Sequence, residues 1–185
     1  NGGLKMLNGN IGKSVAKISA VKEEFRYIKE KALVFNDQEE VKKAYEKGKL
    51  NRNVIIVVRN QGPKANGMPE LHSLTPMLSN LQDLGFKVAL LTDGRMSGAS
   101  GKILAAIHVT PEAIDNGVIG KIEDDDEIEI DANNGNLNIL TDISKRKNSL
   151  LNDRKKNQSF GRNIFNTLRI HSQGSEEGGG IKLID

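Results

Sequence analysis

A glycine-rich loop in the middle of the chain carries most of the side chains that could do chemistry. Residues 86–91 are mostly apolar, and residues 92–102 then read Thr-Asp-Gly-Arg-Met-Ser-Gly-Ala-Ser-Gly-Lys. Glycine lets backbone N–H groups approach a ligand closely, and a serine hydroxyl placed among such groups can take part in catalysis. The loop therefore indicates an anion-binding site or a catalytic hydroxyl.

The loop matches none of the common glycine-loop motifs. It does not end in G-K-[S/T], and Gly94, Gly98 and Gly101 do not have the spacing of G-x-G-x-x-G. Ser97 is not flanked as in G-x-S-x-G. On these residues alone, a turn without chemistry stays an alternative.

A second informative segment follows the β-branched run 54–58. Residues 59–70 contain two glycines and two prolines, and leucines then recur at three- and four-residue spacing from Leu71 to Leu81. This spacing predicts an amphipathic helix with Pro69 in its first turn, which would place Glu70 at the helix N-terminus. Glu70 is then either a carboxylate that the helix dipole favours or a metal ligand, and the local pattern favours the former.

Hydrophobic patterning predicts the strands and helices that must position these loops. Strands are expected at 14–21, 54–58, 86–91 and 103–109, and a hairpin at 127–131 and 136–140 around Asn-Asn-Gly. One helix is expected with Asn36 as its N-cap and Glu39 completing a capping box, another with Thr110 as its cap, and a short one over 160–168.

Composition bounds the kind of protein. The chain has 185 residues, a formal net charge of +3, no cysteine and 4% aromatic residues. Basic residues cluster only at 145–147 and 154–156, so we expect no nucleic-acid partner. No apolar run reaches the length of about 20 residues that a membrane span needs, so we expect no membrane partner either. The lack of cysteine excludes thiolate ligands within the chain and suits a cytoplasmic protein.

The two ends differ from the middle. Residues 1–12 are rich in glycine and asparagine and are expected to form a loop or a connection from a preceding domain, and residues 171–185 a flexible tail. The domain itself is then expected over 13–170. The histidines at 72, 108 and 171 lack metal-ligand spacing and suit packing or surface positions, although His72 is close to Glu70.

Three stretches taken together resemble one enzyme family. They are Val-Arg-Asn-Gln-Gly-Pro-Lys-Ala-Asn-Gly-Met-Pro-Glu-Leu-His at 58–72, the loop at 91–102, and Ala-Ala-Ile-His-Val-Thr-Pro-Glu-Ala at 105–113. This set resembles the C-terminal domain of the dihydroxy-acid dehydratase and phosphogluconate dehydratase family. Residues 62–72 and the methionine before Ser97 resemble the phosphogluconate branch of the family. At the position before the serine, the branched-chain enzymes usually have phenylalanine. The resemblance is weakest between 143 and 159.

The resemblance implies a β-rich α/β fold, a barrel-like swivelling β/β/α domain with a mixed sheet and flanking helices. It also implies an enzyme about three times as long as this chain. Its N-terminal domain would hold an iron–sulfur cluster through cysteines and would supply further magnesium ligands, and the enzyme would be a homodimer.

The resemblance also implies a reaction and roles for residues. The reaction is removal of water from 6-phospho-D-gluconate in the Entner–Doudoroff pathway, with Ser97 acting as an alkoxide base and Glu70 as a magnesium ligand. Substrate contacts are assigned to Gly98, Ala99, Ser100, Arg95, Lys102 and His72. Other dehydratases of the family, and a non-catalytic anion-binding module, are the alternatives.

Overall fold

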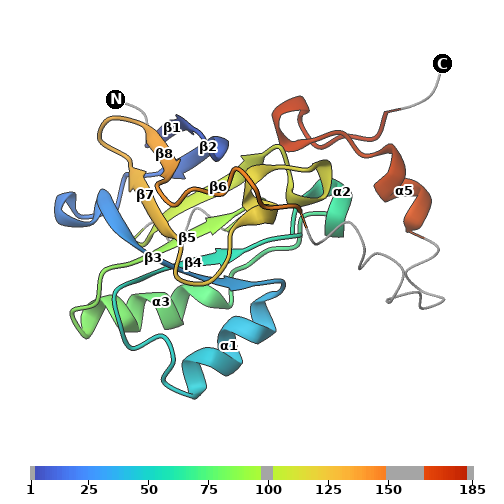
Figure 1. Ribbon diagram of the computed structural model, residues 1–185. Helices are drawn as coiled ribbons and strands as arrows, with labels where there is room; N and C mark the ends of the chain where they lie inside the picture. The colour runs from blue at the N-terminus through green and yellow to red at the C-terminus, as the bar shows by residue number, and fades with distance from the viewer. Residues whose placement is uncertain (1–2, 97–101, 149–164, 183–185) are drawn as a thin grey trace.

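A closed barrel of eight strands forms the centre of the computed structural model, which describes residues 3–96, 102–148 and 165–182 (Figure 1). The strands are β1 (Leu4–Gly9), β2 (Gly12–Lys17), β3 (Tyr27–Phe35), β4 (Val54–Val58), β5 (Val88–Thr92), β6 (Leu104–Thr110), β7 (Glu127–Asp131) and β8 (Asn136–Ile139). Their order around the barrel is β1-β2-β6-β5-β4-β3-β7-β8. Strands β3 to β6 are parallel neighbours, and most other pairs are antiparallel. The β-rich, barrel-like α/β fold with a mixed sheet is therefore confirmed.

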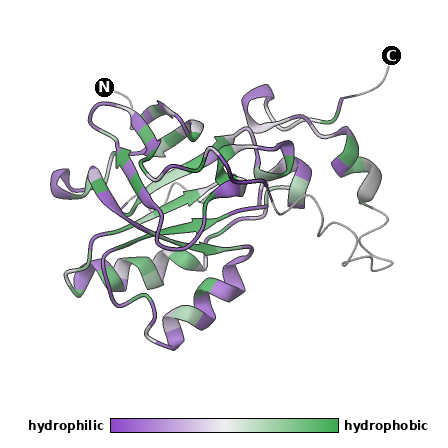
Figure 2. Ribbon diagram, viewed as in Figure 1, coloured by the Kyte–Doolittle hydropathy of each residue, from purple (hydrophilic) through white to green (hydrophobic). Residues whose placement is uncertain are grey.

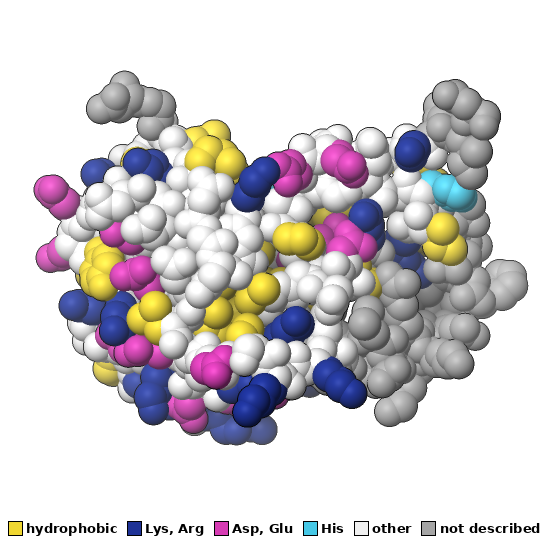
Figure 3. All heavy atoms as spheres, turned by 45° about the horizontal axis from the view of Figure 1, so that its top comes forward, with side chains coloured by type: hydrophobic (Ala, Val, Ile, Leu, Met, Phe, Trp, Pro, Cys, Tyr) yellow, Lys and Arg dark blue, Asp and Glu magenta, His cyan; other side chains and the backbone are white. Residues whose placement is uncertain are grey.

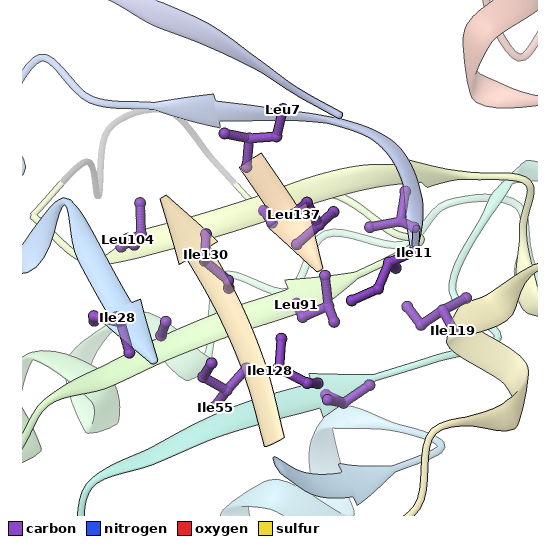
Figure 4. Close-up of a cluster of buried hydrophobic side chains, with 14 of the residues drawn as sticks. Leu7, Ile11, Ile28, Ile55, Leu91, Leu104, Ile119, Ile128, Ile130 and Leu137 are labelled. Carbon is purple, nitrogen blue, oxygen red and sulfur yellow. The ribbon is translucent and has the colours of Figure 1, made fainter. Parts of the chain in front are cut away.

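Two hydrophobic cores lie on the two sides of the parallel strands. In β4, Ile55 and Val57 point into the barrel, whereas Val54, Ile56 and Val58 belong to the core outside it. Figure 4 shows the interior core, to which strands from all sides of the barrel contribute leucine and isoleucine side chains. Burial on both faces explains why this strand is continuously apolar rather than alternating.

The two longest helices cover the outer side of the parallel strands. The helices are α1 (Gln38–Glu46), α2 (Pro63–Asn66), α3 (Leu74–Asp83) and α5 (Asn166–His171), and the short 3-10 turns are η1 (Glu23–Phe25), η3 (Ala113–Asp115), η4 (Val118–Lys121) and η6 (Ser175–Glu177). Both α1 and α3 lie below the sheet in Figure 1 and bury apolar side chains in the outer core. In Figure 2 the parallel strands β4, β5 and β6 are largely green, whereas α1 carries many purple residues.

The start of α1 differs by one residue from the expectation. Asp37, not Asn36, is the N-cap, and its Oδ1 accepts a hydrogen bond from the Glu40 backbone N–H at 2.9 Å. The Glu40 carboxylate in turn accepts from the Asn36 N–H at 2.8 Å. The predicted capping box is wrong, because Asp37 is the N-cap and the N–H that bonds to the Glu40 carboxylate belongs to Asn36, the residue before the cap.

The expectation of a loop at the N-terminus was wrong for Leu4–Gly9. These residues form β1, which pairs along its whole length with β2 and closes the barrel through Asn8 and Asn136 of β8. Gly9 has a packing reason, because a Cβ there would collide with the Leu137 carbonyl oxygen. Glycine content therefore misled the prediction here. A connection from a preceding domain stays a prediction.

The other differences concern helix starts and the C-terminal end. No helix begins at Thr110, which is the last residue of β6 and is followed by the 3-10 turn η3 with Glu112 as its N-cap. The expected helix from Pro69 begins at Leu74. The described part of the expected tail is folded, since Ser172 bridges to Ile181 and Glu176 pairs with Lys13. No helix among the described residues is long and apolar enough to cross a membrane.

Candidate active site

Three parallel strands end at the same end of the barrel, on the right of Figure 1. The loops that follow β4, β5 and β6 therefore meet there, although they are far apart in the sequence. They include the two segments that the sequence singled out and the Thr-Pro-Glu-Ala stretch. This end of the barrel is the candidate site, as expected for loops at the carboxyl ends of parallel strands.

Asp93 ties these loops together from the centre. Its side chain is fully buried, and its two oxygens accept hydrogen bonds from the backbone N–H groups of Gln61 at 2.8 Å and of Asn60 and Ala113 at 3.1 Å each. Burial raises the pKa of Asp93 above its usual range, and the three donors oppose that rise. One carboxylate thus fixes the exits of β4 and β6 to that of β5.

Glu112, in the loop after β6, fixes the start of α2 to that loop. Its side chain is 1% exposed, and its oxygens accept from the backbone N–H groups of Lys64 and Ala65 at 3.2–3.3 Å. A Cβ at position 62 would collide with this carboxylate, which explains the glycine there. Burial raises the pKa of Glu112 to about 7.

The raised pKa of Glu112 predicts a pH-dependent stability. Between pH 4.5, the ordinary value, and about 7, the folded protein keeps a proton that the unfolded chain releases, so this contribution is greatest at low pH and is lost as pH rises. Glu112→Gln does not titrate. The free energy of unfolding of Glu112→Gln minus that of the wild type should therefore increase as the pH is raised through this window, by on the order of 3 kcal/mol. Urea unfolding at a series of pH values measures this difference. Glu46→Gln, an exposed change on α1, is the control; the prediction is wrong if the Glu112→Gln difference stays constant with pH.

Glu70 and Arg95 meet where the first two loops run side by side. Their backbones form a parallel bridge, and the Leu71 N–H donates to the Arg95 carbonyl oxygen at 3.1 Å. Arg95 Nη1 lies 3.3 Å from Glu70 Oε2, and Arg95 Nε donates to the Met68 carbonyl oxygen at 2.9 Å. The guanidinium is therefore held from two sides by the segment that carries Glu70.

The second carboxylate oxygen of Glu70 has no hydrogen-bond partner. Glu70 Oε1 is buried, while the side chain as a whole is 31% exposed. A buried carboxylate oxygen without a donor is costly and is suited to a cation. The expected position at a helix N-terminus was wrong, because α3 begins at Leu74. The helix-dipole interpretation therefore no longer accounts for Glu70.

His108 lies beside the same pair. Its backbone N–H donates to the Gly94 carbonyl oxygen at 2.9 Å, and its backbone is left-handed with φ 57°. Its side chain is half-buried, and burial together with the nearby Arg95 charge lowers the pKa of the imidazole. His108 therefore lies next to the loop that carries Arg95.

The other predicted site residues are placed elsewhere or lie outside the described part. Lys102 Nζ pairs with Asp83 Oδ1 at 2.6 Å and contacts Ser79 Oγ at 3.1 Å, so it faces α3. The His72 side chain is exposed. Four predicted site residues fall outside the described residues: Ser97, Gly98, Ala99 and Ser100. Over residues 3–96, 102–148 and 165–182, no group of three acidic or histidine side chains could by itself hold a metal ion.

Comparison with known proteins identifies the family. The family model described as dihydroxy-acid/6-phosphogluconate dehydratase C-terminal matches residues 1–179. The chain belongs to this dehydratase family. It is 50% identical to a phosphogluconate dehydratase of Helicobacter pylori over 99% of the chain, and 51% identical to that of Rhizobium meliloti over 97%. A dihydroxy-acid dehydratase of Campylobacter lari is 44% identical over 79% of the chain.

The chain spans about a third of the length of these dehydratases, 32% and 30% for the first two. In this dehydratase domain the sequence singled out Glu70 and Arg95, which the fold brings together. It missed Asp93 and Glu112 as organisers of the loops and His108 as their neighbour. An acidic residue directly after an apolar strand was the available sign for Asp93, but only the fold shows which N–H groups it meets.

Proposed function

We propose that this chain is the C-terminal domain of a phosphogluconate dehydratase, which removes water from 6-phospho-D-gluconate to give 2-dehydro-3-deoxy-6-phosphogluconate. The observation that carries the proposal is the pattern of identity. Relatives named phosphogluconate dehydratase match at 47–51% over 96–99% of the chain, and the dihydroxy-acid dehydratase matches at 44% over 79%.

In the proposed reaction the Ser97 oxygen takes the proton from C2. The electron pair of that C–H bond forms the C2–C3 double bond, hydroxide leaves C3, and the enol product tautomerises to the 2-oxo acid. A serine hydroxyl is too weak a base unless charge nearby stabilises its alkoxide. Arg95, fixed by Met68 and Glu70, is a cationic side chain two residues from Ser97 in the sequence that could supply such charge.

The residues of this chain fit part of the implied cofactor set. Glu70 would hold magnesium through Oε1, the oxygen that lacks a partner. Because the sequence has no cysteine, thiolate ligands of an iron–sulfur cluster would come from the rest of the enzyme. When bound, these groups supply Lewis-acid chemistry to the substrate oxygens. We further propose that the domain works against its own N-terminal domain, in a cytoplasmic homodimer.

Charges of both signs are mixed on the face of the molecule shown in Figure 3. Basic and acidic side chains are interspersed over the face shown in Figure 3, so the described residues on that face form no extended patch of one sign. A nucleic-acid partner would favour a concentrated basic face. The proposal of a small sugar acid as the ligand is supported by the identity to the relatives named phosphogluconate dehydratase.

Kinetic measurements on the full-length enzyme, loaded with its metals, test which acid is the substrate. We expect turnover of 6-phosphogluconate with a kcat/KM at least about 100-fold above those for gluconate and 2,3-dihydroxy-isovalerate, because a site that binds a phosphate discriminates strongly against its loss. The 2-oxo acid product is measured with semicarbazide. Preference for dihydroxy-isovalerate would instead assign the branched-chain reaction, which the Campylobacter lari relative favours, and no turnover of any acid would favour a non-catalytic module.

A further inference from the structure

His108 occupies a bulge in β6. The pairing of β2 with β6 shifts between Lys13 and Val15, which pair with Thr110 and Ile107. Two steps along β2 therefore match three along β6, so β6 has one extra residue. The core shows the same shift, because Leu104 and Ala106 point into the barrel and the next interior residue is Val109. Without the bulge, position 108 would face the barrel interior.

The bulge instead brings His108 next to the loop that follows β5. Its N–H bonds to Gly94, the neighbour of Arg95, and the Ser14 hydroxyl holds the preceding carbonyl, that of Ile107, at 2.7 Å. A left-handed backbone at a residue as large as histidine is uncommon, and such positions persist where the surroundings fix them. Glycine would adopt this conformation at less cost. The bulge therefore does not explain why the residue is histidine.

The neighbours of His108 point to a ligand. Arg95 is close enough for its charge to act on the imidazole, and Arg95 is itself anchored by the Met68 carbonyl and Glu70. The Oε1 of Glu70 is buried and has no hydrogen-bond partner within the described structure. The anchored Arg95 cation and the half-buried imidazole beside it match the carboxylate and hydroxyl oxygens of a hydroxy acid.

We propose that the His108 imidazole contacts the substrate directly, by a hydrogen bond to a carboxylate or hydroxyl oxygen of the sugar acid beside Arg95. This inference rests on the proposed function, because it takes the ligand to be a hydroxy acid. It assigns His108 rather than His72 as the histidine of the site. The β6 bulge is then the device that turns this side chain out of the barrel and toward the substrate.

The test uses His108→Asn and His108→Gly in the full-length enzyme. Both residues accept a left-handed backbone, so the bulge is kept while the imidazole is lost. We expect kcat/KM for 6-phosphogluconate to fall about 10- to 100-fold in both, with a rise in KM accounting for part of the loss. The apparent affinity for magnesium and the unfolding temperature should match those of the wild type. His171→Gln, in α5, is the control and should keep wild-type kinetics.

Two results would overturn the inference. One is kinetics within twofold of the wild type in both variants, which would mean that His108 serves only the bulge. The other is a loss of activity that comes with a lower unfolding temperature in both variants, which would assign His108 to stability. If the wild type instead turns over dihydroxy-isovalerate, the substrate of the proposed function is wrong, and the same variants test His108 with that acid.

Discussion

Ser97→Ala in the full-length enzyme should lower kcat by at least about 10³-fold, with little change in KM. The expected result follows from the proposed role of Ser97 as the group that takes the C2 proton. Alanine has no oxygen to accept that proton, and a water molecule in its place would lack the surrounding charge. The assignment comes from the family resemblance, and Ser97 lies outside the described residues.

The ends of the Ser97 loop support this expectation. Met96 and Ile103 are both buried in the outer core, and Asp93 is locked by three backbone donors. The described residues on either side of 97–101 are therefore anchored by the barrel, and removal of one hydroxyl should leave these anchors in place. Cluster absorbance, metal content and unfolding temperature should stay at wild-type values.

Matched measurements separate chemistry from folding. Ser19→Ala removes an exposed hydroxyl after β2 and should leave kcat unchanged. Substrate binding to the Ser97→Ala enzyme, measured by calorimetry, should be retained because the base acts on the proton and not on affinity. A kcat within tenfold of the wild type would show that another group is the base.

Glu70→Gln should weaken the apparent affinity for magnesium at least about 100-fold and lower kcat/KM by a similar factor. The amide keeps the size of the side chain and replaces one carboxylate oxygen by an NH₂ group. That change removes the negative charge from the oxygen Oε1, which has no partner within the described structure. Metal content after gel filtration and magnesium dependence of the rate are the two measurements.

The ion pair with Arg95 provides the internal comparison. Arg95→Gln removes the partner of Oε2, 3.3 Å away, and leaves Oε1 in place. We expect this variant to keep most of its magnesium affinity while Glu70→Gln loses it, and Glu46→Gln to resemble the wild type. Equal magnesium binding in the Glu70→Gln enzyme and the wild type would refute the role of Glu70 as a ligand.

Local patterns predicted several elements well. The β-branched run at 54–58 became β4 within the expected bounds, and Asn-Asn-Gly at 133–135 became the turn between β7 and β8. These features depend on neighbours in the sequence. By contrast, β1 and the long β3 were not predicted, because Leu4–Gly9 lies within the glycine- and asparagine-rich stretch 1–12 and Tyr27–Phe35 carries outward lysines. Each has one partner nearby in the sequence, β2 for β1 and β4 for β3, and one distant partner, β8 and β7, that only the closed barrel supplies.

The sequence by itself determined the family, the buried parallel strands and the two loops that carry Glu70, Arg95 and Ser97. Only the tertiary structure decided which of these residues meet. It joined Glu70 to Arg95, sent Lys102 to Asp83 on α3, and placed His108 beside Gly94. The physical reason is that closure of the barrel fixes the register of distant strands, and a single extra residue in β6 changes where a side chain points.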